Sequence, residues 1–133
     1  RMIISVDGTL ALPVYEQICE QVVRMVVAGA LEPGTRMPTI RQLAHDLQLA
    51  KGTVAKAYAQ LEEASVLESF GHRGTFIAAS AISPPRDREL AKASLHAAAD
   101  AYVLAAHQIG VDLDQARAVL GERWGHLTLG EPG

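Results

Sequence analysis

Hydrophobic residues recur at helical spacing over residues 13–29. One side of a helix over this segment would carry only apolar side chains: Val14, Ile18, Val22, Met25 and Val26. Spacings of three and four residues are typical of an amphipathic helix that packs on a core. Pro13 suits the first turn of this helix and Gly29 suits its C-terminal cap. The sequence therefore predicts a first helix between these two residues.

Two shorter helices are predicted after a connection rich in proline and glycine, PGTRMP at 33–38. Thr39 and Gln42 form a T-x-x-Q capping box for a helix from Ile40 to about Leu47. A third helix begins near Lys51, and its core side consists of Val54, Ala57, Tyr58, Leu61 and Ala64. Two short helices joined by a tight turn, after an initial helix, have the outline of a helix-turn-helix unit.

A two-stranded hairpin is predicted after the third helix. The runs VLESF (66–70) and TFIAA (75–79) hold β-branched and aromatic residues and flank the turn sequence GHRG. Gly71 and Gly74 can adopt the positive φ that a tight hairpin connection requires. Three helices followed by a hairpin form the winged helix-turn-helix layout, so the predicted fold class is mainly α with a small β-hairpin.

The sequence SAISPPRD separates two parts of the chain, because Pro84 and Pro85 can join neither neighbouring element. We expect a winged helix-turn-helix domain over residues 1–79, a linker over 80–85 and a helical tail over 86–133. The tail is predicted to hold two amphipathic helices, the second of which opens with a D-x-x-Q capping box. Two such helices enclose too little interior to fold alone. They need a partner surface, either the first domain or a second copy of the tail.

Charge is distributed unevenly along this acidic chain, which has 133 residues, a net charge of −3 and a pI near 5.9. Residues 33–77 hold five basic and four acidic residues, a balance of +1, whereas residues 1–32 and 78–133 each have a balance of −2. The segment with the helix-turn-helix and the hairpin is thus the only one of the three with a positive balance. Local positive potential of this kind attracts a polyanion.

Several motifs in this order resemble the GntR family of bacterial transcription regulators, in particular its YtrA-like subfamily with a short two-helix C-terminal region. The matching stretches are PVYEQI (13–18), GALEPGTRMPTIRQLAHDL (29–47), KGTVAKAYAQLE (51–62) and RGTFI (73–77). The resemblance implies a winged-helix domain, a homodimer joined through the C-terminal helices, and binding to a two-fold symmetric DNA operator, with repression of transcription as the expected outcome.

Residues at the expected DNA surface follow from this resemblance and from their chemistry. A recognition helix lies in the major groove with its N-terminal residues towards base edges, and it needs an unencumbered face and positive charge. The residues that match are Arg41, Lys51, Gly52, Thr53, Lys56, Gly71, His72 and Arg73. The first opens the second helix, the next four lie on the outer side of the third helix, and the last three form the tip of the hairpin.

Four positions depart from the family pattern, and one of them is Ala55, which stands where many members have an arginine. Ala50 stands where a capping Ser, Thr or Asn is usual, and Lys51 replaces a common arginine. Lysine is a point charge that cannot make the planar two-donor contact of arginine to guanine, so base readout at this position is expected to be weaker. Ser65 replaces a glycine that usually precedes the hairpin.

Other classes of function find little support in the sequence. The five histidines form no HxxxH motif and there is no CxxC, so no metal site is expected. No nucleotide fingerprint, serine elbow or convergent carboxylate pair is present, and we expect neither an enzyme nor a cofactor. No apolar run approaches the ~18 residues that a membrane span needs. With one cysteine, Cys19, and no signal peptide at the first residues, a cytoplasmic protein is expected.

Two alternatives to a DNA-binding repressor stay open at this point. A winged-helix module that binds protein and has lost affinity for DNA would agree with the overall negative charge. A ligand-sensing regulator would hold an unidentified small molecule between its C-terminal helices. The sequence identifies neither an operator nor an effector.

Overall fold

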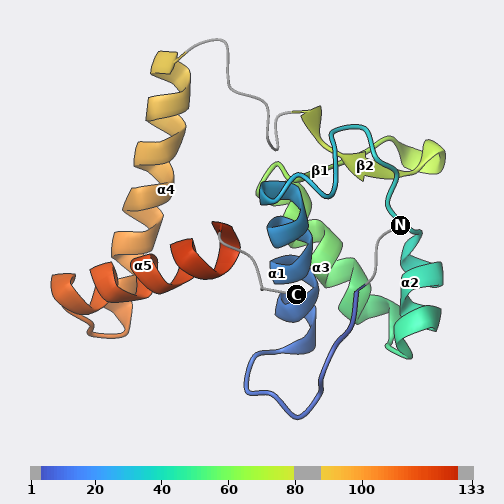
Figure 1. Ribbon diagram of the computed structural model, residues 1–133, viewed down its shortest axis with the longest axis horizontal. Helices are drawn as coiled ribbons and strands as arrows, with labels where there is room; N and C mark the ends of the chain where they lie inside the picture. Colours follow the sequence, from blue (N-terminus) through green and yellow to red (C-terminus); the bar gives the residue numbers. More distant parts are fainter. Residues whose placement is uncertain (1–3, 80–87, 129–133) are drawn as a thin grey trace. The chain divides into compact units, whose positions relative to one another are not determined.

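The computed structural model describes residues 4–79 and 88–128 of the chain (Figure 1). The chain divides into two compact units, Arg1–Ser83 and Pro84–Gly133. The linker expected at 80–85 lies outside the described residues. In chain order the elements are α1 (Val14–Val27), α2 (Ile40–Leu47), α3 (Lys51–Glu63), β1 (Leu67–Ser69), the 3₁₀ turn η1 (Gly71–Arg73), β2 (Thr75–Ile77), α4 (Arg88–Gln108) and α5 (Leu113–Thr128).

The first unit has one hydrophobic core, to which all three of its helices contribute. Most side chains on their predicted apolar sides are buried or half-buried in this core. The largest fully buried side chains are Ile18, Val22, Val54 and Leu61 of the helices and Ile77 of β2. One predicted core position is wrong: Ala64 is exposed, because α3 has ended at Glu63 and Ala64 lies in the cap beyond it. The fold class is confirmed as mainly helical with a small antiparallel sheet.

The ends of α1 and α2 are set by local chemistry that the sequence indicated. Gly29 has φ +80° just after α1, and the amide of Ala30 donates to the carbonyl of Met25 at 2.8 Å, which closes the helix. At α2 the Thr39 side chain accepts a hydrogen bond from the amide of Gln42 at 3.0 Å. Gln48 then ends α2 in the left-handed conformation with φ +57° and begins the turn into α3.

The wing consists of the two strands of the hairpin and a third extended segment that pairs with β2. β1 and β2 pair antiparallel, with Glu68 opposite Phe76. The connection before α2 adds a short third edge to β2, because Arg36 forms an isolated bridge with Phe76. In this bridge the amide of Met37 donates to the carbonyl of Thr75 and the amide of Ile77 donates to the carbonyl of Thr35, both at 2.8 Å. The wing is therefore tied directly to the segment that leads into α2.

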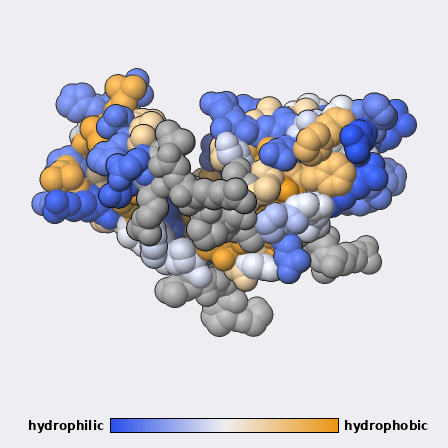
Figure 2. Space-filling model, turned by 90° about the horizontal axis from the view of Figure 1, so that it is seen from above, coloured by the Kyte–Doolittle hydropathy of each residue, from blue (hydrophilic) through white to orange (hydrophobic). Residues whose placement is uncertain are grey.

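The second unit is a pair of helices with no buried residue on α5. The Tyr102 hydroxyl of α4 donates to the carbonyl of Ala116 on α5 at 2.6 Å. The predicted capping box is complete, since Asp112 and Gln115 each accept a hydrogen bond from the other's amide, at 2.8 and 2.9 Å. Large apolar side chains are exposed along both helices, and Figure 2 shows hydrophobic groups among hydrophilic ones on the visible surface. Within the described ranges, no helix combines the length and apolar character needed to cross a membrane.

Candidate nucleic-acid interface

The first turn of α3 presents a small, positively charged surface. Lys51 and Gly52 are exposed, and Thr53 is half-buried. Ala50 has the extended backbone of a helix N-cap, with φ −66° and ψ 144°, but its methyl group can accept no hydrogen bond. The first-turn amides of α3 therefore lack a side-chain cap, and the positive end of the helix dipole is uncompensated there. An anion with oxygen acceptors can satisfy such amides.

The start of α2 is fixed against α3 by a hydrogen bond across the core. The Tyr58 hydroxyl of α3 donates to the carbonyl of Pro38 at 2.7 Å, two residues before α2 begins. Burial raises the pKa of Tyr58, so the phenol keeps its proton and stays a donor. Arg41 projects from the first turn of α2 and is exposed. The contact sets the position of the first turn of α2 relative to the recognition helix.

The tip of the wing is a compact turn that exposes both of its charged or titratable side chains. Gly71 has φ +62° and Gly74 has φ +110°, as the sequence predicted for a tight connection. The amide of Phe70 donates to the carbonyl of Gly74 at 2.9 Å and closes the turn. His72 and Arg73 lie between these glycines and are exposed. Residues Gly71–Arg73 of this turn form a single 3₁₀ turn.

Lys56 has a second role that the sequence did not indicate. Its ammonium nitrogen lies 4.1 Å from the centroid of the Tyr15 ring on α1, in a cation–π contact. The Lys56 side chain is exposed, and its end lies over a ring that belongs to the first turn of α1. Lys56, one of the residues predicted to bind DNA, thus contributes to the contact between α3 and α1.

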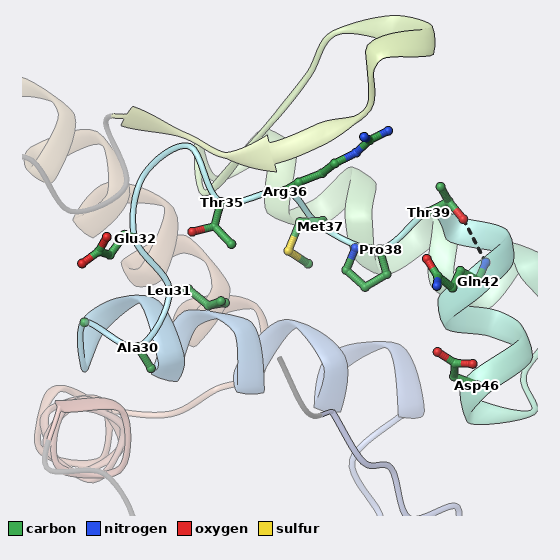
Figure 3. Close-up of a pocket in the computed structure, with 11 residues that line it drawn as sticks. Ala30, Leu31, Glu32, Thr35, Arg36, Met37, Pro38, Thr39, Gln42 and Asp46 are labelled. Carbon is green, nitrogen blue, oxygen red and sulfur yellow. Dashed lines mark hydrogen bonds between the residues drawn. The ribbon is translucent and has the colours of Figure 1, made fainter. Parts of the chain in front are cut away.

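Arg36 is a basic residue at the wing that sequence reasoning missed. It is exposed, and its guanidinium carbon lies 5.9 Å from the centroid of the Phe76 ring. Figure 3 shows its side chain extending along the hairpin. The sequence offered only a lone arginine between Thr35 and Met37. In the structure the side chains of Thr35 and Met37 point away from that of Arg36 (Figure 3). Only the pairing with β2 shows that this segment belongs to the wing.

A surface hollow of about 800 Å³ lies beside these elements (Figure 3). The segment 29–39 forms one side of it, and Gln42 and Asp46 of α2 form the other. None of the residues predicted to contact DNA is among its lining residues, whereas Arg36 is one of them. The basic residues predicted to contact DNA therefore lie at helix starts, on α3 and at the wing tip rather than in this hollow, as a groove-binding surface requires. In the described part of the chain no cluster of three or more metal-ligating side chains is found.

Comparison with known proteins identifies the family. Residues 14–77 match the model of the bacterial regulatory proteins of the gntR family. The chain is 41% identical over 117 residues to the HTH-type transcriptional regulator Rv1152 of Mycobacterium tuberculosis, which covers 88% of this chain and 90% of that protein. The chain belongs to the GntR family.

Two further relatives refine this placement within the GntR family. The HTH-type transcriptional repressor YtrA of Bacillus subtilis is 30% identical over 112 residues, covering 84% of this chain and 85% of the repressor. This match extends beyond the winged helix into the tail and confirms the YtrA-like resemblance. The solved structure of the AraR DNA-binding domain with operator ORX1 is 28% identical with a TM-score of 0.51, covering 58% of this chain and 96% of that domain.

Proposed function

We propose that this GntR-family regulator binds a specific DNA operator through α2, α3 and the wing, and represses transcription as a homodimer. The observation that carries the proposal is the uncapped, basic first turn of α3, where Lys51 and Gly52 are exposed; Arg41 in the first turn of α2 is exposed as well. A relative of similar length is a repressor, and a homologous DNA-binding domain has been solved with its operator. The proposed DNA contacts are the eight residues predicted from the sequence.

The second helical unit supports the homodimer. Its exposed apolar side chains are Leu95, Val103, Leu104, Ile109, Leu113, Val119, Leu120 and Trp124, with exposed fractions from 45% to 78%. Soluble monomers rarely leave large apolar patches uncovered, and eight large exposed apolar side chains lie in this small unit. A second copy of α4 and α5 would bury these side chains and place two recognition helices for two half-sites of a symmetric operator. The regulator acts by binding, with no catalytic step.

A salt titration tests the proposal directly. A labelled duplex, selected in vitro from random sequence, is titrated with the protein at increasing salt. We expect log K to fall linearly with log salt, with a slope of about −0.9 per phosphate contacted. Arg41→Ala should weaken binding while leaving the melting temperature nearly unchanged. Absence of salt-sensitive binding to any duplex would instead favour the alternative that this winged helix binds protein.

One observation favours a second candidate, a regulator that also senses a small apolar molecule. An open groove of about 450 Å³ runs between α4 and α5, with Tyr102, His107 and Leu120 among its lining residues. The same groove would be covered by a second copy in the homodimer. A ligand that binds the groove would raise the melting temperature. It would also change the affinity for the operator, and the operator would change the affinity for the ligand by the same factor. Without such coupling, the groove serves the dimer alone.

A further inference from the structure

Arg36 stands between the two elements that are proposed to meet the DNA backbone. In the sequence it precedes the N-cap of α2, Thr39, by three residues and Arg41 by five. In space its backbone bridges to Phe76 of β2, and its side chain lies against Gly74, the neighbour of Arg73 at the wing tip. A positive group in this place lies between the start of α2 and the wing.

Two residues of the wing, Phe76 and Gly74, lie next to the guanidinium of Arg36. The Phe76 ring lies on one side, with its centroid 5.9 Å from the guanidinium carbon. Gly74 lies on another, and a Cβ built on it would be 3.0 Å from Nε and 3.2 Å from one terminal nitrogen of Arg36. Such distances are tighter than nine in ten real Cβ contacts, so a larger residue at Gly74 would force the Arg36 side chain to shift by a few tenths of an ångström. The last glycine of GHRG therefore has two functions, a positive φ and space for Arg36.

These neighbours leave the guanidinium of Arg36 accessible to an anion. Within residues 4–79 and 88–128, Arg36 makes no ion pair with a carboxylate, and the residue is exposed. An arginine held near an aromatic face without a carboxylate partner keeps its N–H donors for the paired oxygens of a phosphate. Because packing already restricts the side chain, less rotamer freedom is lost when the contact forms.

We propose that Arg36 binds the phosphate backbone of DNA between the start of α2 and the wing, and that Phe76 and Gly74 hold its guanidinium ready for this contact. The inference rests on the proposed function and adds to it a residue that neither the sequence pattern nor the recognition helix supplies. Because phosphates carry no sequence information, the contact contributes affinity without discriminating between sequences.

Two substitutions of Arg36 separate charge from packing. Arg36→Met keeps an apolar stem on Phe76 and removes the charge, whereas Arg36→Lys keeps the charge and loses the planar fork. Lys92→Met is the matched control, because it removes one charge from an exposed site on α4 whose Glu89 partner is 3.6 Å away. Affinity of the protein and of each variant is measured by fluorescence anisotropy over a range of salt, for the selected operator and for an unrelated duplex of equal length, together with the melting temperature.

We expect Arg36→Met to weaken binding to both duplexes by the same factor, on the order of tenfold, and to reduce the magnitude of the salt slope by about 0.9 per protomer. Arg36→Lys should keep the slope and lose less affinity, and Lys92→Met should change neither. Unchanged affinity in Arg36→Met, or a loss with the wild-type slope, would overturn the inference and leave Arg36 as a support for the wing. If the unmodified protein showed no salt-dependent binding, the proposed function would fail first and this inference with it.

Discussion

The ammonium nitrogen of Lys56 lies 4.1 Å from the centre of the Tyr15 ring, and this contact joins the recognition helix to the first helix. The Tyr15 hydroxyl donates to a carboxylate oxygen of Glu16 at 3.0 Å, a bond that also raises the pKa of the phenol. The Tyr15 ring is therefore held by a hydrogen bond within α1, and the Lys56 ammonium lies over its face. A side chain proposed to bind DNA is thus part of the packing of the first unit.

Replacing Lys56 should consequently affect both stability and DNA binding. We expect Lys56→Met to lower the free energy of unfolding by about 0.5–1 kcal/mol, the usual strength of an exposed cation–π pair, and to weaken operator binding. A double-mutant cycle with Tyr15→Leu, measured by urea unfolding, should give a coupling energy of that size. Tyr15→Phe is the control, because it keeps the ring and loses only the bond to Glu16. Strictly additive effects of the two substitutions would show that the contact contributes nothing.

Helix boundaries could be predicted from the sequence because local chemistry sets them. Pro13 stands directly before α1, Thr39 caps α2 and Gly29 ends α1, and each of these residues acts within a few positions of itself. The exposed basic start of α3 was predicted for the same reason, since its apolar side is periodic. Such features need no knowledge of distant parts of the chain.

Features that depend on distant parts of the chain were missed. Arg36 and Phe76 are forty positions apart, and Tyr15 and Lys56 are forty-one apart, so neither pair leaves a local pattern. Ser65 adopts φ +62° where the family pattern has glycine. Glycine adopts this left-handed backbone more readily than serine, and the serine in this chain gave no local sign of it.

The bare N-cap of α3 offers a direct test of local stability. Ala50 already has the extended backbone that a capping residue needs, so Ala50→Ser should supply a hydroxyl acceptor for the first-turn amides without rearrangement. We expect a gain of about 1 kcal/mol in unfolding free energy, measured by urea or thermal unfolding. Ala59→Ser, at an exposed interior position of the same helix, is the control and should lower stability slightly, because serine is a weaker helix former. Equal effects at the two positions would argue against the capping explanation.

The buried thiol of Cys19 makes stability depend on alkaline pH. Its Sγ–H donates to the carbonyl of Ala57 at 3.4 Å, and burial raises the pKa of the thiol from 9.0 to about 11. The unfolded chain loses this proton at lower pH than the folded chain. The contribution of the thiol to stability is therefore complete below pH 9 and is lost as the pH rises towards about 11.

Urea unfolding at a series of pH values checks this prediction. The wild-type protein should lose stability more steeply between pH 9 and about 11 than Cys19→Ala, although the variant is less stable at neutral pH. Tyr58, whose pKa burial also raises, contributes equally to both proteins and cancels in the comparison. Parallel pH profiles for the two proteins would mean that the thiolate forms as easily in the folded state as in the unfolded one.

Trp124, the single tryptophan of the chain, is 69% exposed on α5 and can report on the proposed dimer. In a homodimer formed through α4 and α5 its ring would be covered, so its emission should shift to longer wavelength as dilution separates the subunits. We expect Leu120→Asp to sediment as a monomer and to show, at every concentration, the long-wavelength Trp124 emission that the wild-type protein shows only when dilute. Its operator binding should be much weaker, because two linked half-site contacts become one. Leu10→Asp is the matched control, because Leu10 is 55% exposed in the first unit and its replacement should leave the dimer intact. A Leu120→Asp protein that stayed dimeric would place the interface elsewhere in the chain.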